Sequence, residues 1–156
     1  MNSESFKKAM STLPTGITVV TTSYNNALYG FTANSFTSVS LLPPLVSFCI
    51  RKGSSSANGL IESNYFAVNI LAEHQADLSM HFSKFHIEKF VNIPYTTGAY
   101  SSSPLISGAV SHLECKKFAH YQAGDHIIVI GEVVNAVVNT MDNPLVRQLG
   151  RYRELK

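Results

Sequence analysis

The sequence is poor in charge. Asp, Glu, Lys and Arg make up 14% of its 156 residues, whereas an average soluble domain has about a quarter. The net charge is +2, and basic residues form no cluster longer than Lys7-Lys8, Arg51-Lys52, Lys116-Lys117 and Arg151-Tyr152-Arg153. These are too few for a groove that follows nucleic-acid phosphates. A surface with so little charge favours coverage by another subunit, although a surface rich in Ser, Thr and Asn would give the same composition.

Long hydrophobic runs, a leader pattern and paired cysteines are also missing. No apolar run approaches the roughly 20 residues of a membrane-spanning helix, and Met1 to Glu4 lack the basic and apolar pattern of a secretion signal. Cys49 and Cys115 lie far apart and form no metal or redox motif, so we expect two thiols in core strands. The sequence thus predicts a cytoplasmic protein without nucleic-acid or membrane partners. Its length fits one domain, residues 1–156.

Several common active-site motifs do not occur. The sequence has no G-x-S-x-G, no P-loop and no strand-borne G-x-G-x-x-G, which argues against a hydrolase elbow, a nucleotide-triphosphate loop and a Rossmann site. His81 and His86 are five positions apart, not the four of a helical metal pair. We therefore predict no metal site.

The pattern of apolar and polar residues predicts a mainly β chain with short helices. Alternating, β-branched runs indicate strands, and apolar residues at helical spacing indicate helices. The expected strands span residues 17–22, 30–45, 45–50, 65–71, 110–118 and 125–138, and the expected helical segments span 5–13, 54–61, 73–82 and 142–149. Gly131 marks a bulge or a close approach within the longest strand, and residues 84–107 read as an irregular loop. Short strands at steady spacing favour a closed barrel over a βαβ sheet.

The most informative stretch runs from Gly30 to Leu45. Small hydrogen-bonding side chains stand at nearly every position from Thr32 to Ser40, among residues that favour strands. Such a strand can form the floor of a site for a polar, planar ring, with help from its backbone. It can equally be a half-exposed strand, because threonine is a good strand former.

Two further segments have groups that suit ligands. Ser54-Ser55-Ser56 at an expected helix start, just after Arg51 and Lys52, can bind a phosphate or simply cap the helix. His126 follows Gly124-Asp125 at the start of a strand. Histidine can exchange a proton near neutral pH, but an exposed turn histidine would fit the same pattern.

Taken together, these motifs resemble the flavin reductase-like domain family. Leu13 to Thr22, Gly30 to Leu45, the serine triplet, Glu88-Lys89-Phe90, Gly124-Asp125-His126 and Leu149 to Arg153 match the family's motifs in order over nearly the whole chain. The resemblance implies a mainly β fold, the FMN-binding split β-barrel (Greek-key-like) with short flanking helices. It also implies a homodimer with flavin near the subunit interface. The implied activity is transfer of hydride from NADH or NADPH to FMN or FAD, often to supply a separate flavin-dependent monooxygenase.

The resemblance also assigns roles to residues. Thr32, Ala33, Asn34 and Ser35 would contact the isoalloxazine and ribityl groups, with Ser38 or Ser40 on the same wall. Ser54, Ser55 and Ser56 would bind the phosphate, with Lys89 and Phe90 nearby. His126 would face the nicotinamide, and Tyr152 and Arg153 would close the pocket.

Three readings stay open at this stage. The first is a flavin reductase that serves a partner oxygenase. The second is a barrel that retains FMN and reduces another acceptor. The third is a non-catalytic flavin-binding barrel. His126 favours the first two, because a binding module has no need of an imidazole that faces nicotinamide.

Overall fold

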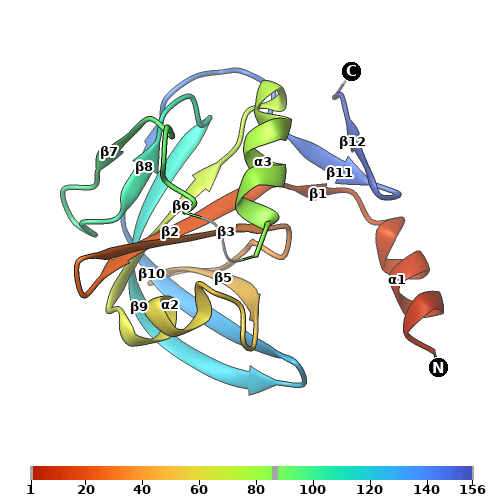
Figure 1. Cartoon of the computed structure of the whole chain (residues 1–156), viewed down its shortest axis with the longest axis horizontal. Coiled ribbons are helices and arrows are strands. Elements are labelled where there is room, and N and C mark those ends of the chain that lie inside the picture. The colour runs from red at the N-terminus through yellow and green to blue at the C-terminus, as the bar shows by residue number, and fades with distance from the viewer. Residues whose placement is uncertain (1, 86–87, 156) are drawn as a thin grey trace.

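The computed structural model describes residues 2–85 and 88–155 (Figure 1). Its helices are α1 (Ser3–Ser11), α2 (Ala57–Glu62), the 3₁₀ helix η1 (Glu73–Gln75) and α3 (Ala76–Ser83). Its strands are β1 (Thr15–Gly16), β2 (Thr18–Tyr24), β3 (Ala27–Ala33), β4 (Thr37–Leu41), β5 (Pro44–Arg51), β6 (Tyr65–Ile70), β7 (Tyr95–Thr97), β8 (Pro104–Ile106), β9 (Ser111–Ala123), β10 (His126–Val138), β11 (Val146–Gln148) and β12 (Arg151–Arg153). The expectation of a mainly β chain with short helices is confirmed.

A seven-stranded antiparallel sheet organises the chain, in the order β3-β2-β6-β9-β10-β5-β4. Figure 1 shows its strands wrapping around one another rather than lying flat. The single strand expected over residues 30–45 is in fact two strands, β3 and β4, at opposite edges of the sheet. β3 begins at Ala27, after a turn in which Asn25 and Asn26 take positive φ values of 50° and 59°, a conformation that asparagine tolerates. It ends at Ala33, and Asn34 to Phe36 carry the chain across to β4.

The core lies on both faces of β2. Val20 packs with Phe48 and Phe66 in one cluster, and Val19 packs with Leu71 and Phe82 in another. Gly131 has both features expected of it. The β9–β10 register shifts between Ile130 and Gly131, and a Cβ at Gly131 would come within 2.3 Å of the Phe66 ring.

The C-terminal region differs from the expectation of a helical turn over residues 142–149. Instead, β1, β11 and β12 form a small three-stranded sheet. Leu149 and Gly150 have φ values of 51° and 74°, so the chain reverses there and cannot continue as a helix. The Leu149 N–H donates to Ser11 O at 2.7 Å, which ties this hairpin to the end of α1.

Residues 84–107 contain the β7–β8 hairpin, and a buried carboxylate fixes the loop between its strands. Glu114 on β9 is 2% exposed. Its Oε2 accepts from the Ser101 N–H (2.7 Å), the Ser101 hydroxyl (2.8 Å) and the Tyr100 N–H (2.9 Å), and its Oε1 accepts from the Asn135 amide (3.2 Å). Burial raises the pKa of Glu114, but these hydrogen bonds together outweigh burial, and the net pKa lies below its ordinary value of 4.5.

Both cysteines are free thiols, as expected. Cys115 is buried in β9, and burial followed by the nearby Glu114 charge raises the pKa of its thiol to about 12. Within residues 2–85 and 88–155, no helix has the length and apolar character needed to cross a membrane.

Candidate functional site

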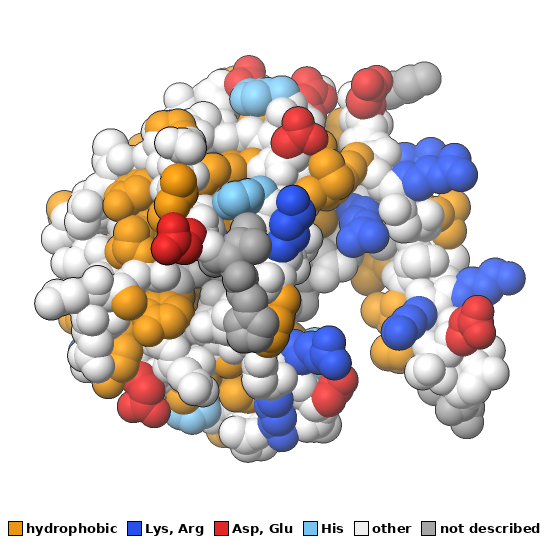
Figure 2. Space-filling view, in the orientation of Figure 1, with side chains coloured by type: hydrophobic (Ala, Val, Ile, Leu, Met, Phe, Trp, Pro, Cys, Tyr) orange, Lys and Arg blue, Asp and Glu red, His pale blue; other side chains and the backbone are white. Residues whose placement is uncertain are grey.

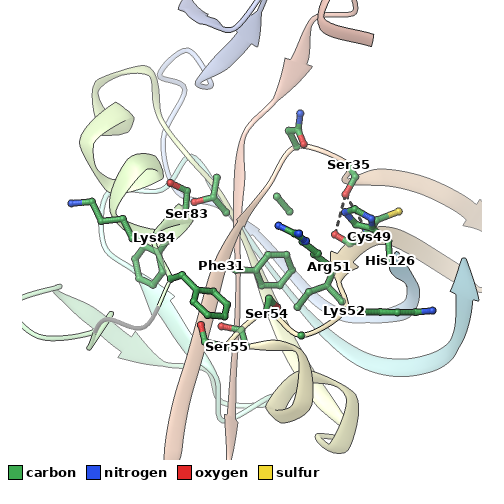
Figure 3. A pocket seen from close by; sticks show the side chains of 18 of the residues that line it. Phe31, Ser35, Cys49, Arg51, Lys52, Ser54, Ser55, Ser83, Lys84 and His126 are labelled. Atoms are coloured by element: carbon green, nitrogen blue, oxygen red, sulfur yellow. Dashed lines mark hydrogen bonds between the residues drawn. The ribbon is translucent and has the colours of Figure 1, made fainter. Parts of the chain in front are cut away.

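A cavity of about 630 Å³ opens beside the edge strand β3 (Figure 3). Its walls come from β3, the Asn34-Ser35 connection, the end of β5, residues 51–56, the end of α3 and the start of β10. Segments that are far apart in the sequence therefore meet here. Phe31, Thr32, Ala33, Asn34, Ser35, Ser54, Ser55, Ser56, Lys89 and His126, which the sequence singled out or which adjoin its motifs, all line this one cavity.

The β3 wall is fastened by its own hydroxyl groups. The Thr32 hydroxyl donates to Ser79 O in α3 at 2.6 Å. The Ser35 hydroxyl accepts from the Cys49 N–H at 2.8 Å and approaches Cys49 O at 3.4 Å, the pair of dashed lines in Figure 3. Ala33 and Asn34 lie between these two anchors. An edge strand also has backbone groups that no neighbouring strand uses, which suits it to hydrogen-bond a flat polar ligand.

The three serines have three different environments. The Ser54 hydroxyl oxygen is buried and has no hydrogen-bond partner among the described atoms. Ser55 is exposed at the rim. Ser56 is buried and donates to Gly30 O at 2.9 Å. It occupies the N-cap position of α2 but makes no capping bond, so the expectation that these serines cap the helix through their side chains is wrong.

The cavity is positively charged. Arg51, Lys52, Lys84 and Lys89 line it, and no Asp or Glu is among the described residues of its wall. A concave site with cations of one sign concentrates anions. The buried Ser54 oxygen adds a second signal, since a buried polar group without a partner is costly unless something else satisfies it. Together these features fit a phosphate-bearing ligand.

His126 lines the cavity, and a hydrogen bond to the neighbouring Asp125 holds its ring. Its Nδ1 lies 2.8 Å from Asp125 Oδ1, and this hydrogen bond lowers the pKa of the exposed Asp125 carboxyl. Two hydrogen bonds from Lys52 fix the turn before His126. The Lys52 ammonium donates to Gly124 O (2.7 Å), and the Lys52 backbone N–H donates to Asp125 O (3.0 Å). With Nδ1 used in this way, Nε2 remains to meet a ligand.

Other predicted site residues lie outside this cavity. Phe90 packs edge-to-face on Phe82 and Tyr95. The Tyr152 hydroxyl donates to the Ser79 hydroxyl at 2.9 Å, and its ring packs on the core. Ser38 and Ser40 are on β4, and Arg153 is on β12. Their roles toward a cofactor stay predictions.

Among the cavity residues that the sequence did not identify are Cys49, Ser83 and Lys84. Cys49 faces it because Cys49 and Arg51 alternate on one face of β5, a signal that the strand pattern contains. Ser83 and Lys84 close the end of α3. Only the packing of α3 against β3 brings them here.

A second hollow of about 820 Å³ lies between α1 and the body of the protein and shares Asn34 and Ser35 with the first. Helix α1 has no buried residue. Its apolar side chains Phe6 and Met10 are about half exposed and line the hollow. Figure 2 shows this helix standing away from the body, with hydrophobic side chains toward the gap.

Comparison with known proteins gives a consistent picture. The family model described as "Flavin reductase like domain" matches residues 10–156. An NADH-dependent FAD reductase of Streptomyces globisporus is 38% identical over 94% of this chain and 82% of its own length. The reductase subunit HsaB of a flavin-dependent monooxygenase of Mycobacterium tuberculosis is 35% identical over 94% of this chain and 79% of its own length.

The fold agrees with these sequence matches. The solved structure of the Streptomyces globisporus NADH:FAD oxidoreductase SgcE6, in complex with NAD and FAD fragments, superposes with a TM-score of 0.95. It is 37% identical and covers 99% of this chain and 93% of that one.

Proposed function

The chain belongs to the flavin reductase like domain family, and on this premise we propose that it is an NAD(P)H:flavin oxidoreductase. It transfers hydride from NADH or NADPH to FMN or FAD. The observation that carries the proposal is the single cavity at the β3 edge, where the flavin-wall residues, the serine triplet and His126 meet. The flavin and nicotinamide rings supply the reactive chemistry, and the protein supplies binding, orientation and electrostatics.

We assign the binding roles from the geometry of this cavity. The backbone of Thr32 to Ser35 forms the wall for the flavin ring, held rigid by the bonds to Ser79 and Cys49. The Ser54 hydroxyl and the Arg51 guanidinium bind the phosphate. A rigid wall matters because hydride transfer needs the two rings held in near-contact alignment.

His126 orients the nicotinamide side of the site. Asp125 holds its Nδ1, so Nε2 is free to donate or accept toward the second substrate. Hydride transfer between the two rings needs no protein base. His126 therefore acts by positioning and by charge, not as a general acid.

A four-way assay tests the activity. The purified protein is mixed with FMN or FAD and with NADH or NADPH, and the nicotinamide absorbance band is followed over time. Oxidation with at least one pair is expected. If none of the four pairs is turned over, the proposal fails.

We further propose that the protein is a homodimer with the split-barrel fold, formed from a single domain over residues 1–156. Support comes from the apolar face of α1, where Phe6 and Met10 are about half exposed, and from Leu41 and Leu42 at the β4–β5 turn, 87% and 93% exposed. Apolar surface of this extent marks an interaction site. A second copy over α1 would also cover the hollow that adjoins the flavin wall at Asn34 and Ser35.

Light scattering after size exclusion tests the dimer. The expected mass is that of two 17.1 kDa chains. Met10→Glu, which puts a charge on the exposed apolar face of α1, should shift the protein toward the monomer. Lys8→Gln on the same helix should leave the dimer intact. A monomeric wild-type protein would contradict the proposal.

Two further parts of the proposal concern cellular context. The relative HsaB is a reductase subunit of a monooxygenase, and we propose that this chain likewise supplies reduced flavin to a separate flavin-dependent monooxygenase. The free cysteines fit a reducing compartment, and we propose the cytoplasm. Stimulation of turnover when an oxygenase from the same cell is added would support the first part.

A further inference from the structure

With flavin as the substrate of this cavity, we propose that Lys89 is a positioning residue that fastens α3 to the flavin wall, rather than a ligand of the flavin phosphate. Its ammonium donates to Gly30 O at 2.9 Å and to Phe82 O at 3.0 Å. Gly30 is on β3, two residues before the flavin wall begins at Thr32, and Phe82 is in the last turn of α3. One nitrogen therefore joins the two sides of the cavity.

The Gly30 carbonyl can accept from side chains because β3 is an edge strand, paired only with β2. Two donors from distant parts of the chain meet on it. The Ser56 hydroxyl arrives from the start of α2 at 2.9 Å, and the Lys89 ammonium arrives from the segment after α3. Satisfying an edge carbonyl in this way fixes the strand without another strand beside it.

The surroundings of Lys89 hold its ammonium in place. The Lys89 carbonyl lies 2.8 Å from His81 Nε2, so its backbone is tied to α3 as well. Its neighbour Phe90 packs edge-to-face on Phe82 at 5.3 Å between ring centroids. The ammonium is partly buried, and burial lowers its pKa. Two of its three N–H groups are used on backbone carbonyls, which is the pattern of a structural crosslink.

A phosphate ligand and a positioning residue predict different results with different flavins. Riboflavin has the same ring and ribityl chain as FMN but no phosphate. Loss of a phosphate ligand weakens the binding of FMN and leaves the binding of riboflavin unchanged. Loss of a residue that holds the wall weakens the binding of both flavins by the same factor, because each flavin ring contacts the same wall.

The experiment compares Lys89→Met with wild type and with Lys116→Met, a control that removes an exposed lysine from β9 outside the cavity. Wild-type turnover with FMN is measured first, so failure of the proposed activity is seen before any variant is judged. Dissociation constants for FMN and riboflavin are then measured by quenching of flavin fluorescence, with kcat and KM for the nicotinamide.

Lys89→Met is expected to raise both flavin dissociation constants by a common factor of about ten, equal to about 1.4 kcal/mol. The nicotinamide KM and the control should change little. A loss confined to FMN, or no loss at all, would overturn the positioning role.

If Lys89→Met does not fold, Lys89→Arg decides the question. Arginine retains the charge near the phosphate, but its planar, branched head cannot take the position of one nitrogen between two carbonyls. A positioning role predicts that this variant binds both FMN and riboflavin more weakly, by a similar factor. A purely electrostatic role predicts that both are bound as in wild type.

Discussion

The Ser54 hydroxyl gives the most direct test of the phosphate site, because its oxygen is buried and has no hydrogen-bond partner among the described residues. A buried polar group left without a partner costs about 1–3 kcal/mol. Ser54→Ala removes that cost and a small amount of packing. Without flavin, the variant should therefore be as stable as wild type or more stable by up to ~1 kcal/mol. For a domain of this size, that corresponds to a rise in Tm of about 2–4 °C.

Binding should change in the opposite direction. A hydrogen bond to a charged group contributes about 1.5–3 kcal/mol, which corresponds to a rise of roughly 10- to 150-fold in the dissociation constant for FMN. Riboflavin lacks the phosphate, so its affinity should stay within about twofold of wild type. Ser54→Ala thus differs from Lys89→Met, which is expected to weaken both flavins.

Thermal unfolding without ligand and fluorescence titration with FMN and riboflavin measure the two effects on one sample. The reasoning is refuted if FMN binds the variant as tightly as wild type. It is refuted equally if the ligand-free variant loses more than about 1 kcal/mol, because Ser54 would then have a structural partner that explains its burial.

Three further predictions follow from the described contacts. His126→Ala should raise the nicotinamide KM more than it weakens flavin binding, and unchanged steady-state kinetics would contradict its role. Gly30→Ala would bring a Cβ within 2.8 Å of the buried Phe82 ring, so urea unfolding should show a loss of about 1–3 kcal/mol; an unchanged midpoint would mean that the aromatic pair can shift. The folded pKa of Glu114 lies below its ordinary value because its hydrogen bonds outweigh burial. Its contribution to stability should therefore be present above about pH 4.5 and disappear as the pH falls through the folded pKa. Glu114→Gln should lower stability at pH 7 and reduce this acid dependence, and an identical pH profile would show that another group is responsible.

Local patterns predicted most of the strands, because these segments are rich in residues that favour strands. Burial alternates along β5 and the first half of β10, whereas β2 and β6 are buried continuously over most of their length. β2, β5, β6 and β10 lie close to their expected positions, and Gly131 shows its bulge. One error arose where the chain reverses at a residue that is not glycine. Leu149 has positive φ, a conformation for which leucine has no preference. Its turn is set by the bond to Ser11, which is a tertiary contact.

The sequence could predict which segments form the site, but it could not predict most of the contacts between them. Thr32 to Ser35, the serine triplet and His126 do meet in one cavity. The spacing of residues in the sequence could not show which of these side chains make hydrogen bonds within the protein. Ser56 was expected to cap a helix and instead bonds a strand 26 residues earlier in the chain. Lys84 completes the cationic wall only because α3 packs against β3.

The polar character of the Thr32 to Ser56 region therefore has two separate origins. Thr32, Ser35 and Ser56 each bond a backbone carbonyl or N–H of another segment. Those bonds fix an edge strand that has no second strand beside it, and they would be needed with any ligand. Ser54 is the serine whose buried hydroxyl has no described partner. A run of hydroxyl residues in such a sequence thus indicates mainly how a rigid wall is built on a sheet edge, and the residue left unpaired within it indicates where the ligand binds.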